Sequence, residues 1–449
     1  MRSVCPDRLP SCHPGVPVFL LLAVLGLGAC NTTHGLGHPG EDRRICQLIG
    51  QSDAFSGHHT GFALYDPEHD TWLCRREADK YYLPASNIKI LTLLTAMHVL
   101  QDSIETIRYT VQGDTLLFEG CADPSFLYWG IRSNGETFRR LRDFNGVVCY
   151  LPPVAIPPYG KGWAWDDYVY GYQSEKSVFP MYGNRVRFTG DGYGNVETIP
   201  GYFSDYVMED SGLDRKTNRD PVTNTFVVNP DMLQQGDTVS VPNIVSDFEV
   251  ARILGDTLHR EVCLEYVEPA SPLSHVIRDT ARDTLLKRMM QVSDNFIAEE
   301  LLMQCAYQMR GTYNSDSAIA VAERMIFAGT PQVLRWVDGS GLSRMNLLTP
   351  ESVVWTLDQI LRLSSEQYVM DIFPTGGKSG TISEWYGDTV PFVFAKTGSL
   401  SGVHCLSGYL RTKKGRLLIF SFMHNHYIGS SIQIKEEMSD ILKAIRDRY

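Results

Sequence analysis

The pattern of apolar residues changes twice along the chain, near residues 109 and 271. Between these positions, short β-type runs such as YTVQGDTLLFEG, NRVRFTG, TNTFVVNP and GDTVSVPNIV are separated by Gly, Pro, Asn and Asp. On both flanks the apolar residues follow helical spacing or form longer strand-like runs. The chain is therefore predicted to hold a mostly β domain, residues 109–271, inserted into a second domain made of residues 44–108 and 272–449.

The flanking segments indicate an α+β domain. Three successive runs, VPFVFAKTGSL, GVHCLSGYLRT and RLLIFSFMHNH, predict antiparallel strands, and IQIKEEMSDILKAIRDRY predicts an amphipathic terminal helix. Near the start, TGFALYDPEHDTWLC predicts a hairpin that turns at Asp66-Pro67. Antiparallel strands followed by a helix that packs on them are typical of the α+β class.

Two further segments predict buried helices. From Ile88 to Leu100 the residues are apolar nearly all round, so this helix is expected in the core, with Ser86 at or just inside its N-terminus. The stretch DTARDTLLKRMMQVSDNFIAEELLMQCAYQM predicts a pair of helices. Their break falls at Ser293-Asp294-Asn295, residue types that prefer caps and turns.

The first thirty residues predict export. Arg2 and Arg8 precede an apolar stretch that is too short to span a bilayer comfortably. It ends in Leu-Gly-Ala-Cys, which resembles the bacterial lipoprotein box, so lipidation at Cys30 is expected, with residues 1–30 as the signal and 31–43 as a flexible tether. The alternative is an ordinary signal peptide with a chance cysteine.

Charge and cysteine content exclude some classes of function. The formal net charge is −11 and there is no long basic run, which argues against a nucleic-acid partner. Beyond Cys30 there are seven cysteines at scattered spacing. The odd number leaves at least one free or paired outside the chain, and most are expected to be small buried hydrophobes. No Cys-x-x-Cys pair is present, so a zinc site is not expected, and no other metal or cofactor is predicted.

Ser86 and Lys89 are the first candidates for chemistry. On a helix, residues three apart lie on one face, so a neutral Lys89 amine could take the proton of the Ser86 hydroxyl. The helix N-terminus would favour the anion that forms there. Taken alone, the same pair could equally be an N-capping serine and a solvated lysine.

Two later motifs carry a similar ambiguity. Ser293 could relay a proton and Asn295 could hold a substrate amide, or both could merely cap a turn between helices. After the strand FVFA, Lys396, Thr397, Gly398 and Ser399 fit a carboxylate-binding strand, although an edge-strand lysine could also be solvated. A competing Lys378-Ser379-Gly380 lies in the loop FPTGGKSGTI, so the strand context favours Lys396.

Two other signals receive structural interpretations. Asp338-Gly339-Ser340-Gly341 lacks the further ligands of an EF-hand loop, so it is predicted to be a turn beside the site. His424 and His426, two apart on a strand, are expected to be structural or exposed residues, not metal ligands.

The three motifs together are more specific than any one. Ser-x-x-Lys, Ser-Asp-Asn and Lys-Thr-Gly, in this order, resemble the signature of penicillin-binding proteins and class A β-lactamases. More than two hundred residues separate Ser86 from Ser293, which is too many for a simple β-lactamase. The chain resembles the D-Ala-D-Ala carboxypeptidase/endopeptidase family of low-molecular-mass penicillin-binding proteins, the type with a large insert between the first two motifs.

This resemblance implies a fold and a chemistry. The fold would be a β-lactamase/transpeptidase-like domain, with an antiparallel sheet flanked by helices and a helical subdomain. Peptidoglycan stem peptides would acylate Ser86 with Lys89 as base, and Ser293, Asn295 and Lys396 would complete the catalytic set. Thr397, Gly398 and Ser399 would bind substrate. β-Lactams would act as inhibitors, and the protein would work in the periplasm or cell envelope, anchored to a membrane by lipid. Lys378, an extra basic residue in a loop near the site, could alter substrate preference.

Two alternatives share these residues. A β-lactamase would release the acyl group quickly, whereas a penicillin-binding protein would release it slowly, so penicillin turnover separates the two. A non-catalytic wall-binding protein on the same fold would not be labelled by fluorescent penicillin.

Overall fold

The computed structural model describes residues 42–449. The predicted signal, Cys30 and residues 31–41 of the predicted tether lie outside the described residues. None of the described helices combines the length and the apolar character that a membrane crossing requires.

A five-stranded antiparallel sheet organises the two ends of the described chain. Its strand order is β14-β15-β16-β1-β2. The strands are β1 His59–Asp66, β2 Thr71–Arg76, β14 Val393–Leu400, β15 Val403–Arg411 and β16 Leu417–Asn425. The predicted hairpin at Asp66-Pro67 and the three predicted C-terminal strands are thus confirmed.

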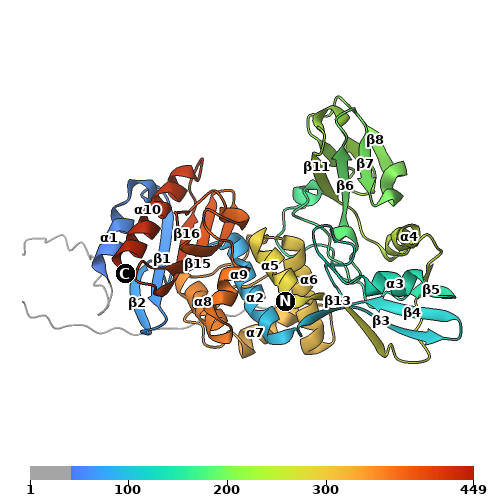
Figure 1. Ribbon diagram of the computed structural model, residues 1–449, viewed down its shortest axis with the longest axis horizontal. Coiled ribbons are helices and arrows are strands. Elements are labelled where there is room, and N and C mark those ends of the chain that lie inside the picture. Colours follow the sequence, from blue (N-terminus) through green and yellow to red (C-terminus); the bar gives the residue numbers. More distant parts are fainter. Residues whose placement is uncertain (1–41) are drawn as a thin grey trace, which may run out of the picture. The chain divides into compact units, whose positions relative to one another are not determined.

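Helices cover both faces of this sheet (Figure 1). The first face packs against α1 (Arg43–Gln51) and α10 (Ile432–Arg448), and the second against a larger group of helices. Strand β16 is buried along its whole length because alternate side chains point to opposite faces. Phe420 and Phe422 join the core under α10, whereas Ile419 and Met423 join the core on the other side.

The larger helical group contains the predicted buried helix and the predicted helix pair. Its members are α2 Ile88–Val99, α5 Arg282–Gln291, α6 Asn295–Arg310, α7 Ser315–Met325, α8 Pro350–Leu363 and α9 Glu366–Ile372. Lys89 is wholly buried in α2, in agreement with the apolar pattern around it. The break between α5 and α6 falls at Ser293 and Asp294, where Asp294 caps α6 by accepting a hydrogen bond from the amide of Ile297.

The part of the chain between α2 and α5 forms three smaller sheets, which share one hydrophobic core. Their strand orders are β12-β5-β4-β3-β13, β11-β6-β7 and β8-β10-β9. The strands are β3 Ser103–Gln112, β4 Thr115–Gly120, β5 Val147–Tyr150, β6 Arg185–Gly190, β7 Val196–Ile199, β8 Val207–Glu209, β9 Thr217–Arg219, β10 Phe226–Val228, β11 Thr238–Pro242, β12 Cys263–Leu264 and β13 His275–Ala281. Two helices, α3 Glu136–Arg142 and α4 Asp247–Leu258, pack with them.

The first of these sheets extends past the predicted limits of the insert. Strands β3 and β13 pair with each other, so the sheet begins at Ser103 and ends at Ala281, not at residues 109 and 271. The alternation in SIETIR and in HVIRDTA is too short to separate these ends from the adjoining helices by pattern alone. The division into a catalytic and an inserted domain stays a prediction.

The structure corrects the expectation for the cysteines. Cys46 and Cys74 form a disulfide between α1 and β2, and Cys149 and Cys263 form another between β5 and β12. Only the remaining three, Cys121, Cys305 and Cys405, are free and buried as predicted. Sequence spacing could not reveal the pairs because both are made between elements that meet only in the folded chain.

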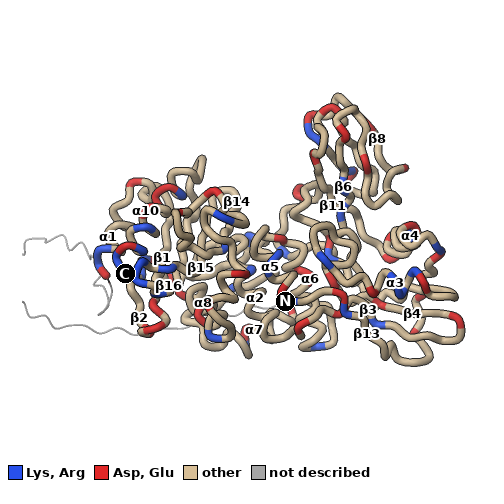
Figure 2. The backbone as a smooth tube through the Cα atoms, in the orientation of Figure 1, with Lys and Arg blue, Asp and Glu red and all other residues tan. Residues whose placement is uncertain are grey.

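Charges of both signs are spread through the described residues (Figure 2). Many pair locally, as Lys161 does with Asp316 and Arg411 with Glu366. Such exposed pairs contribute little stability, so the buried lysines described below are the informative charges.

Candidate active site

Ser86 lies in a tight 3-10 turn, Ala85–Asn87, immediately before α2. Ala85 has a positive φ of 46°, a conformation that a residue other than glycine adopts only when its surroundings hold it there. On one side, Asn425 accepts a hydrogen bond from the Leu83 amide at 2.7 Å and donates one to the Leu83 carbonyl at 3.1 Å. On the other, the buried Asn87 donates to Ser407 Oγ at 2.8 Å. The turn that carries Ser86 is therefore fixed to strands β15 and β16.

Two glycines let neighbouring backbone approach this turn. A Cβ on Gly398 would clash with the carbonyl oxygen of Pro84 and would lie 3.2 Å from the Ser86 amide nitrogen. A Cβ on Gly341 would clash with the carbonyl oxygen of Ala85. Gly341 also has a φ of 86°, which favours glycine. Gly398 and Gly341 thus each allow a close backbone approach to the turn.

Replacing Gly398 by alanine should therefore displace Ser86 and lower kcat/KM for the reaction proposed below by about 100-fold, since displacements near 1 Å at a reacting group cost that much. Steady-state kinetics would measure the effect. The matched control is Gly57→Ala, where nothing lies within 4 Å of the added Cβ and activity should not change. Equal activity of the Gly398→Ala protein would contradict the tight packing of the turn.

Lys89 links the first motif to two distant segments. Its Nζ donates to Ser86 Oγ at 3.0 Å, to Asn295 Oδ1 at 2.6 Å and to the Ser340 carbonyl at 2.6 Å. All three donor positions of an ammonium are used in this way. The hydrogen bonds aim the amine at the hydroxyl of Ser86, which lies within proton-transfer distance.

Burial lowers the pKa of the Lys89 amine toward neutral pH. It lowers the pKa of Lys89 to about 8, although Asp338, Glu299 and Asp294 act in the opposite direction. Lys396 is also fully buried, and burial together with the Lys89 charge lowers the pKa of Lys396 well below its usual range. Two buried amines in one site favour states in which one of them is neutral.

A pH dependence follows from the pKa of Lys89. The neutral amine is the form that can accept a proton, so the rate of Ser86 acylation should rise about tenfold for each pH unit below 8 and level off above it. Stopped-flow acylation by a penicillin between pH 6 and 9 would record the profile, with circular dichroism as a check that the protein stays folded. A rate that falls as the pH rises over this range would contradict a lysine base.

Ser293 and Lys396 form a second serine–lysine pair beside the first. Lys396 Nζ donates to Ser293 Oγ at 2.8 Å and to the carbonyl of Thr397 at 2.7 Å. Ser293 has a positive φ of 59°, which directs this turn between α5 and α6. The neighbouring Asp294 is buried and accepts a hydrogen bond from Tyr128 at 2.7 Å. The turn is held from the side of the three smaller sheets.

Asn295 connects the lysine to the same side. Its amide oxygen accepts from Lys89, and its Nδ2 donates to the carbonyl of Tyr172 at 2.9 Å. The side chain is half-buried at the start of α6. The structure thus brings Ser86 and Asn295 each into contact with Lys89.

The third motif lies on β14, the edge strand of the main sheet. Thr397 Oγ1 donates to Thr381 Oγ1 at 2.7 Å, and the hydroxyl of the exposed Ser399 lies 3.3 Å from His404 Nδ1. Lys378 of the competing motif is exposed in the loop after α9 and lines a different cavity from Ser86. Lys378 does not line the cavity of Ser86, so its position does not support the predicted influence on substrate preference.

The sequence predicted that the loop Asp338–Gly341 lies beside the site, but it did not predict what the loop contributes. It lies beside the site as predicted, and its Ser340 carbonyl is a partner of Lys89. Asp338 holds the loop by accepting from the amides of Gly341 and Ser343. The buried Glu299 accepts from the Ser340 amide at 2.8 Å, and burial raises the pKa of Glu299 to about 7. A backbone carbonyl acting as a partner leaves no side-chain signal in a sequence.

Ser86 opens into a cavity of about 280 Å³. Four motif residues contribute to its lining: Ser86, Ser293, Thr397 and Ser399. The remaining lining residues are Thr381, Ile382, Trp385, Tyr386, His404 and Lys435, none of which the sequence motifs identified. Aspartate and glutamate are absent from this lining, so the cavity suits an anionic ligand.

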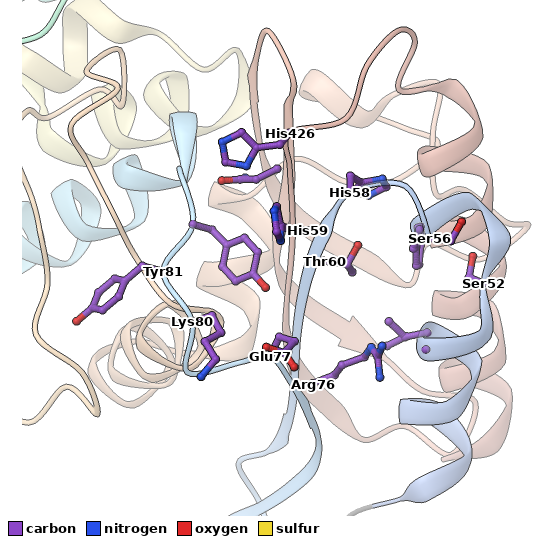
Figure 3. Close-up of a pocket in the computed structure, with 15 residues that line it drawn as sticks. Ser52, Ser56, His58, His59, Thr60, Arg76, Glu77, Lys80, Tyr81 and His426 are labelled. Carbon is purple, nitrogen blue, oxygen red and sulfur yellow. The ribbon is translucent and has the colours of Figure 1, made fainter. Parts of the chain in front are cut away.

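A larger cavity of about 710 Å³ lies elsewhere, beside the segment that leads to Ser86 (Figure 3). It is lined by Tyr82 and Asn425, and by His59 and His426, whose ring centroids are 5.5 Å apart. His424 is buried and hydrogen-bonded to His58 at 2.9 Å. No motif residue lines this cavity, so it is not the reaction site.

Part of the chain is similar to known carboxypeptidases. Residues 271–445 match the model of the D-Ala-D-Ala carboxypeptidase 3 (S13) family. A D-alanyl-D-alanine carboxypeptidase DacB from Haemophilus influenzae is 33% identical over 174 residues, 37% of this chain and 36% of that protein. A carboxypeptidase DacB from Mycolicibacterium smegmatis is 32% identical over 155 residues, 31% of this chain and 33% of that protein. The chain thus aligns with about a third of the length of each relative.

Solved structures extend the likeness to most of the chain. The structure of penicillin binding protein 4 (dacB) from Haemophilus influenzae has a TM-score of 0.70 at 21% identity and covers 89% of this chain and 98% of its own. A predatory endopeptidase from Bdellovibrio bacteriovorus, in complex with an immunity protein, has a TM-score of 0.51 at 17% identity, covering 86% and 94%. At such identities the likeness shows the fold, and it confirms the predicted α+β, β-lactamase/transpeptidase-like class.

Proposed function

Since residues 271–445 match the D-Ala-D-Ala carboxypeptidase 3 (S13) family, we propose that the chain is a low-molecular-mass penicillin-binding protein of the D-Ala-D-Ala carboxypeptidase type and that it hydrolyses the bond between the two D-alanines of peptidoglycan stem peptides. The observation that carries this proposal is the 3.0 Å contact between Ser86 Oγ and the buried Nζ of Lys89. A serine hydroxyl and an amine of lowered pKa at this distance are the components of an activated nucleophile.

The proposed reaction begins with neutral Lys89. Its amine takes the proton of Ser86 as Oγ bonds to the carbonyl carbon between the two D-alanines. The backbone N–H groups of Ser86 and Ser399 are proposed to stabilise the oxyanion of the resulting tetrahedral species. Ser293, in contact with Lys396, then passes a proton to the leaving amine as the C–N bond breaks. Water hydrolyses the ester and restores Ser86.

The edge strand β14 is proposed to align the substrate. Its outer side carries Thr397 and Ser399 into the same cavity as Ser86. An extended peptide can add to such an edge, and hydroxyl groups beside a buried lysine can hold its terminal carboxylate. Gly398 would keep the strand close to the nucleophile, and Asn295 would support the peptide amide.

β-Lactams are proposed to acylate the same serine. A structure of the Haemophilus influenzae protein holds a β-lactam, at a TM-score of 0.67 to this chain. A strained cyclic amide presents its carbonyl to Ser86 as the peptide does, and slow release of the acyl group would distinguish this enzyme from a β-lactamase.

Release of D-alanine from a stem pentapeptide ending in D-Ala-D-Ala tests the proposal. The purified protein should release one D-alanine per peptide, and one equivalent of benzylpenicillin should abolish the release. A folded protein that releases no D-alanine and forms no penicillin adduct would refute the proposal and would favour a non-catalytic role in wall binding.

We also infer a location in the cell envelope. Two disulfides are compatible with an oxidising compartment and are rare in the cytosol. Lipidation at Cys30 would anchor the protein to a membrane, with Cys30 as the new N-terminus after removal of residues 1–29. The intact mass of protein extracted from membranes tests this step, since an unmodified N-terminus would contradict it.

A further inference from the structure

The cavity that holds Ser86 has a wall that the three motifs do not account for. Trp385, from the segment after α9, and Lys435, from the first turn of α10, both line it. Lys435 Nζ lies 4.9 Å from the centroid of the Trp385 ring, a cation–π contact that holds the ammonium in place. Both side chains are half-buried.

Lys435 makes no ion pair with a carboxylate of residues 42–449. Some other lysines near the surface do make one, such as Lys413 and Lys443, whereas Lys287 and Lys378 do not. The cavity lining adds no acidic residue. A half-buried ammonium of this kind is free to pair with an anionic ligand, and it would do so more strongly than a fully exposed one.

Lys435 lies in the part of the cavity that would hold the leaving group, because Ser399, which would bind the carboxylate of the leaving D-alanine, lines the same cavity. His404 lines this cavity with them. His404 Nδ1 lies 3.3 Å from Ser399 Oγ. Burial, and to a smaller extent the positive charge of Lys435, lowers the pKa of His404 to about 3. A neutral His404, held also by Tyr386 at 3.3 Å, orients Ser399 without adding charge. Lys435 therefore supplies the cation on this wall.

The family resemblance already implies cleavage of both peptide cross-links and terminal D-alanine; we propose that Lys435 and Trp385 form a subsite for a second carboxylate on the leaving group and thereby favour the cross-link over single D-alanine. The inference rests on the proposed function. D-Alanine has one carboxylate, which Thr397 and Ser399 would take up. A leaving group that is itself a stem peptide carries further carboxylates, and one of these can reach the ammonium of Lys435 while the ring of Trp385 packs on the peptide. The bond broken and the water consumed are the same in both reactions.

The test compares two substrates in one variant. Lys435→Gln should lower kcat/KM for a cross-linked muropeptide dimer about tenfold and leave kcat/KM for the monomeric pentapeptide within about twofold. Lys435→Arg keeps the cation and should retain the preference for the dimer. Lys443→Gln, on the same helix and outside the cavity, should change neither rate.

Penicillin acylation, measured in every variant, distinguishes failure of the Lys435 subsite from failure of the proposed function. If the parent acylates but Lys435→Gln lowers both substrates equally, or neither, the subsite is overturned and the proposed function stands. If the parent neither cleaves peptide nor forms an adduct, the proposed function is overturned and the subsite with it.

Discussion

Replacing Ser86 by alanine should reduce D-alanine release at least about 10⁴-fold, because the substitution removes the atom that forms the acyl-enzyme. The remaining site would still bind substrate through β14, so KM should change far less than kcat. The change removes one oxygen from a half-buried side chain whose hydroxyl, within residues 42–449, forms a hydrogen bond only with Lys89. The fold should therefore persist.

Stability and rate together make this result interpretable. The melting temperature of the Ser86→Ala protein should lie within a few degrees of the parent, since one hydrogen bond is worth about 1 kcal/mol. Residual activity above about one per cent in a folded variant would mean that another group is the nucleophile.

Replacing Lys89 by methionine should lower the rate of acylation by about 10³-fold, the usual contribution of a general base. Methionine keeps much of the volume of lysine in this fully buried position but cannot accept the proton of Ser86. It also leaves Asn295 Oδ1 and the Ser340 carbonyl without their donor. Pre-steady-state acylation by penicillin would measure the loss directly.

Lys378→Met is the matched control for this lysine. Lys378 belongs to the competing Lys-Ser-Gly sequence but is exposed and lines a different cavity. The control should acylate at the parent rate. An equal loss in both variants, or none in Lys89→Met, would refute the assignment of Lys89 as the base.

The motif residues could be predicted because their chemistry depends on the type of side chain, which the sequence shows. Ser86 and Lys89 share a helical face, and Lys396 follows an apolar strand, so local periodicity places each of them on the right element. Their convergence could not be derived from pattern. It came from the resemblance to a family, and the structure then gave the 2.6 Å contact between Lys89 and Asn295.

Other parts of the site depend on tertiary contacts that leave no local signal. The Ser340 carbonyl approaches Lys89 only because Asp338 and Glu299 hold its loop. His404 and Lys435 are ordinary members of a strand and a helix until the fold places them beside Ser399. The disulfide partners were equally hidden, since Cys149 and Cys263 meet only when β5 pairs with β12.

The three smaller sheets also contribute to the site in a way that their sequence did not reveal. Trp163 Nε1 donates to Asp338 at 2.9 Å, Tyr128 donates to Asp294, and the Tyr172 carbonyl accepts from Asn295. Asp294 is next to Ser293 in the chain, Asn295 contacts Lys89, and Asp338 holds the loop whose Ser340 carbonyl contacts Lys89. The region that separates the first two motifs along the chain therefore braces both of them in the folded protein.

Mapping the penicillin adduct tests the central claim most directly. After incubation with benzylpenicillin, proteolysis and tandem mass spectrometry, the penicilloyl mass should be found on Ser86 alone, with one adduct per chain. An adduct on Ser293 or on any other residue, or a folded protein that remains unmodified, would contradict the account of Ser86 as a nucleophile activated by Lys89.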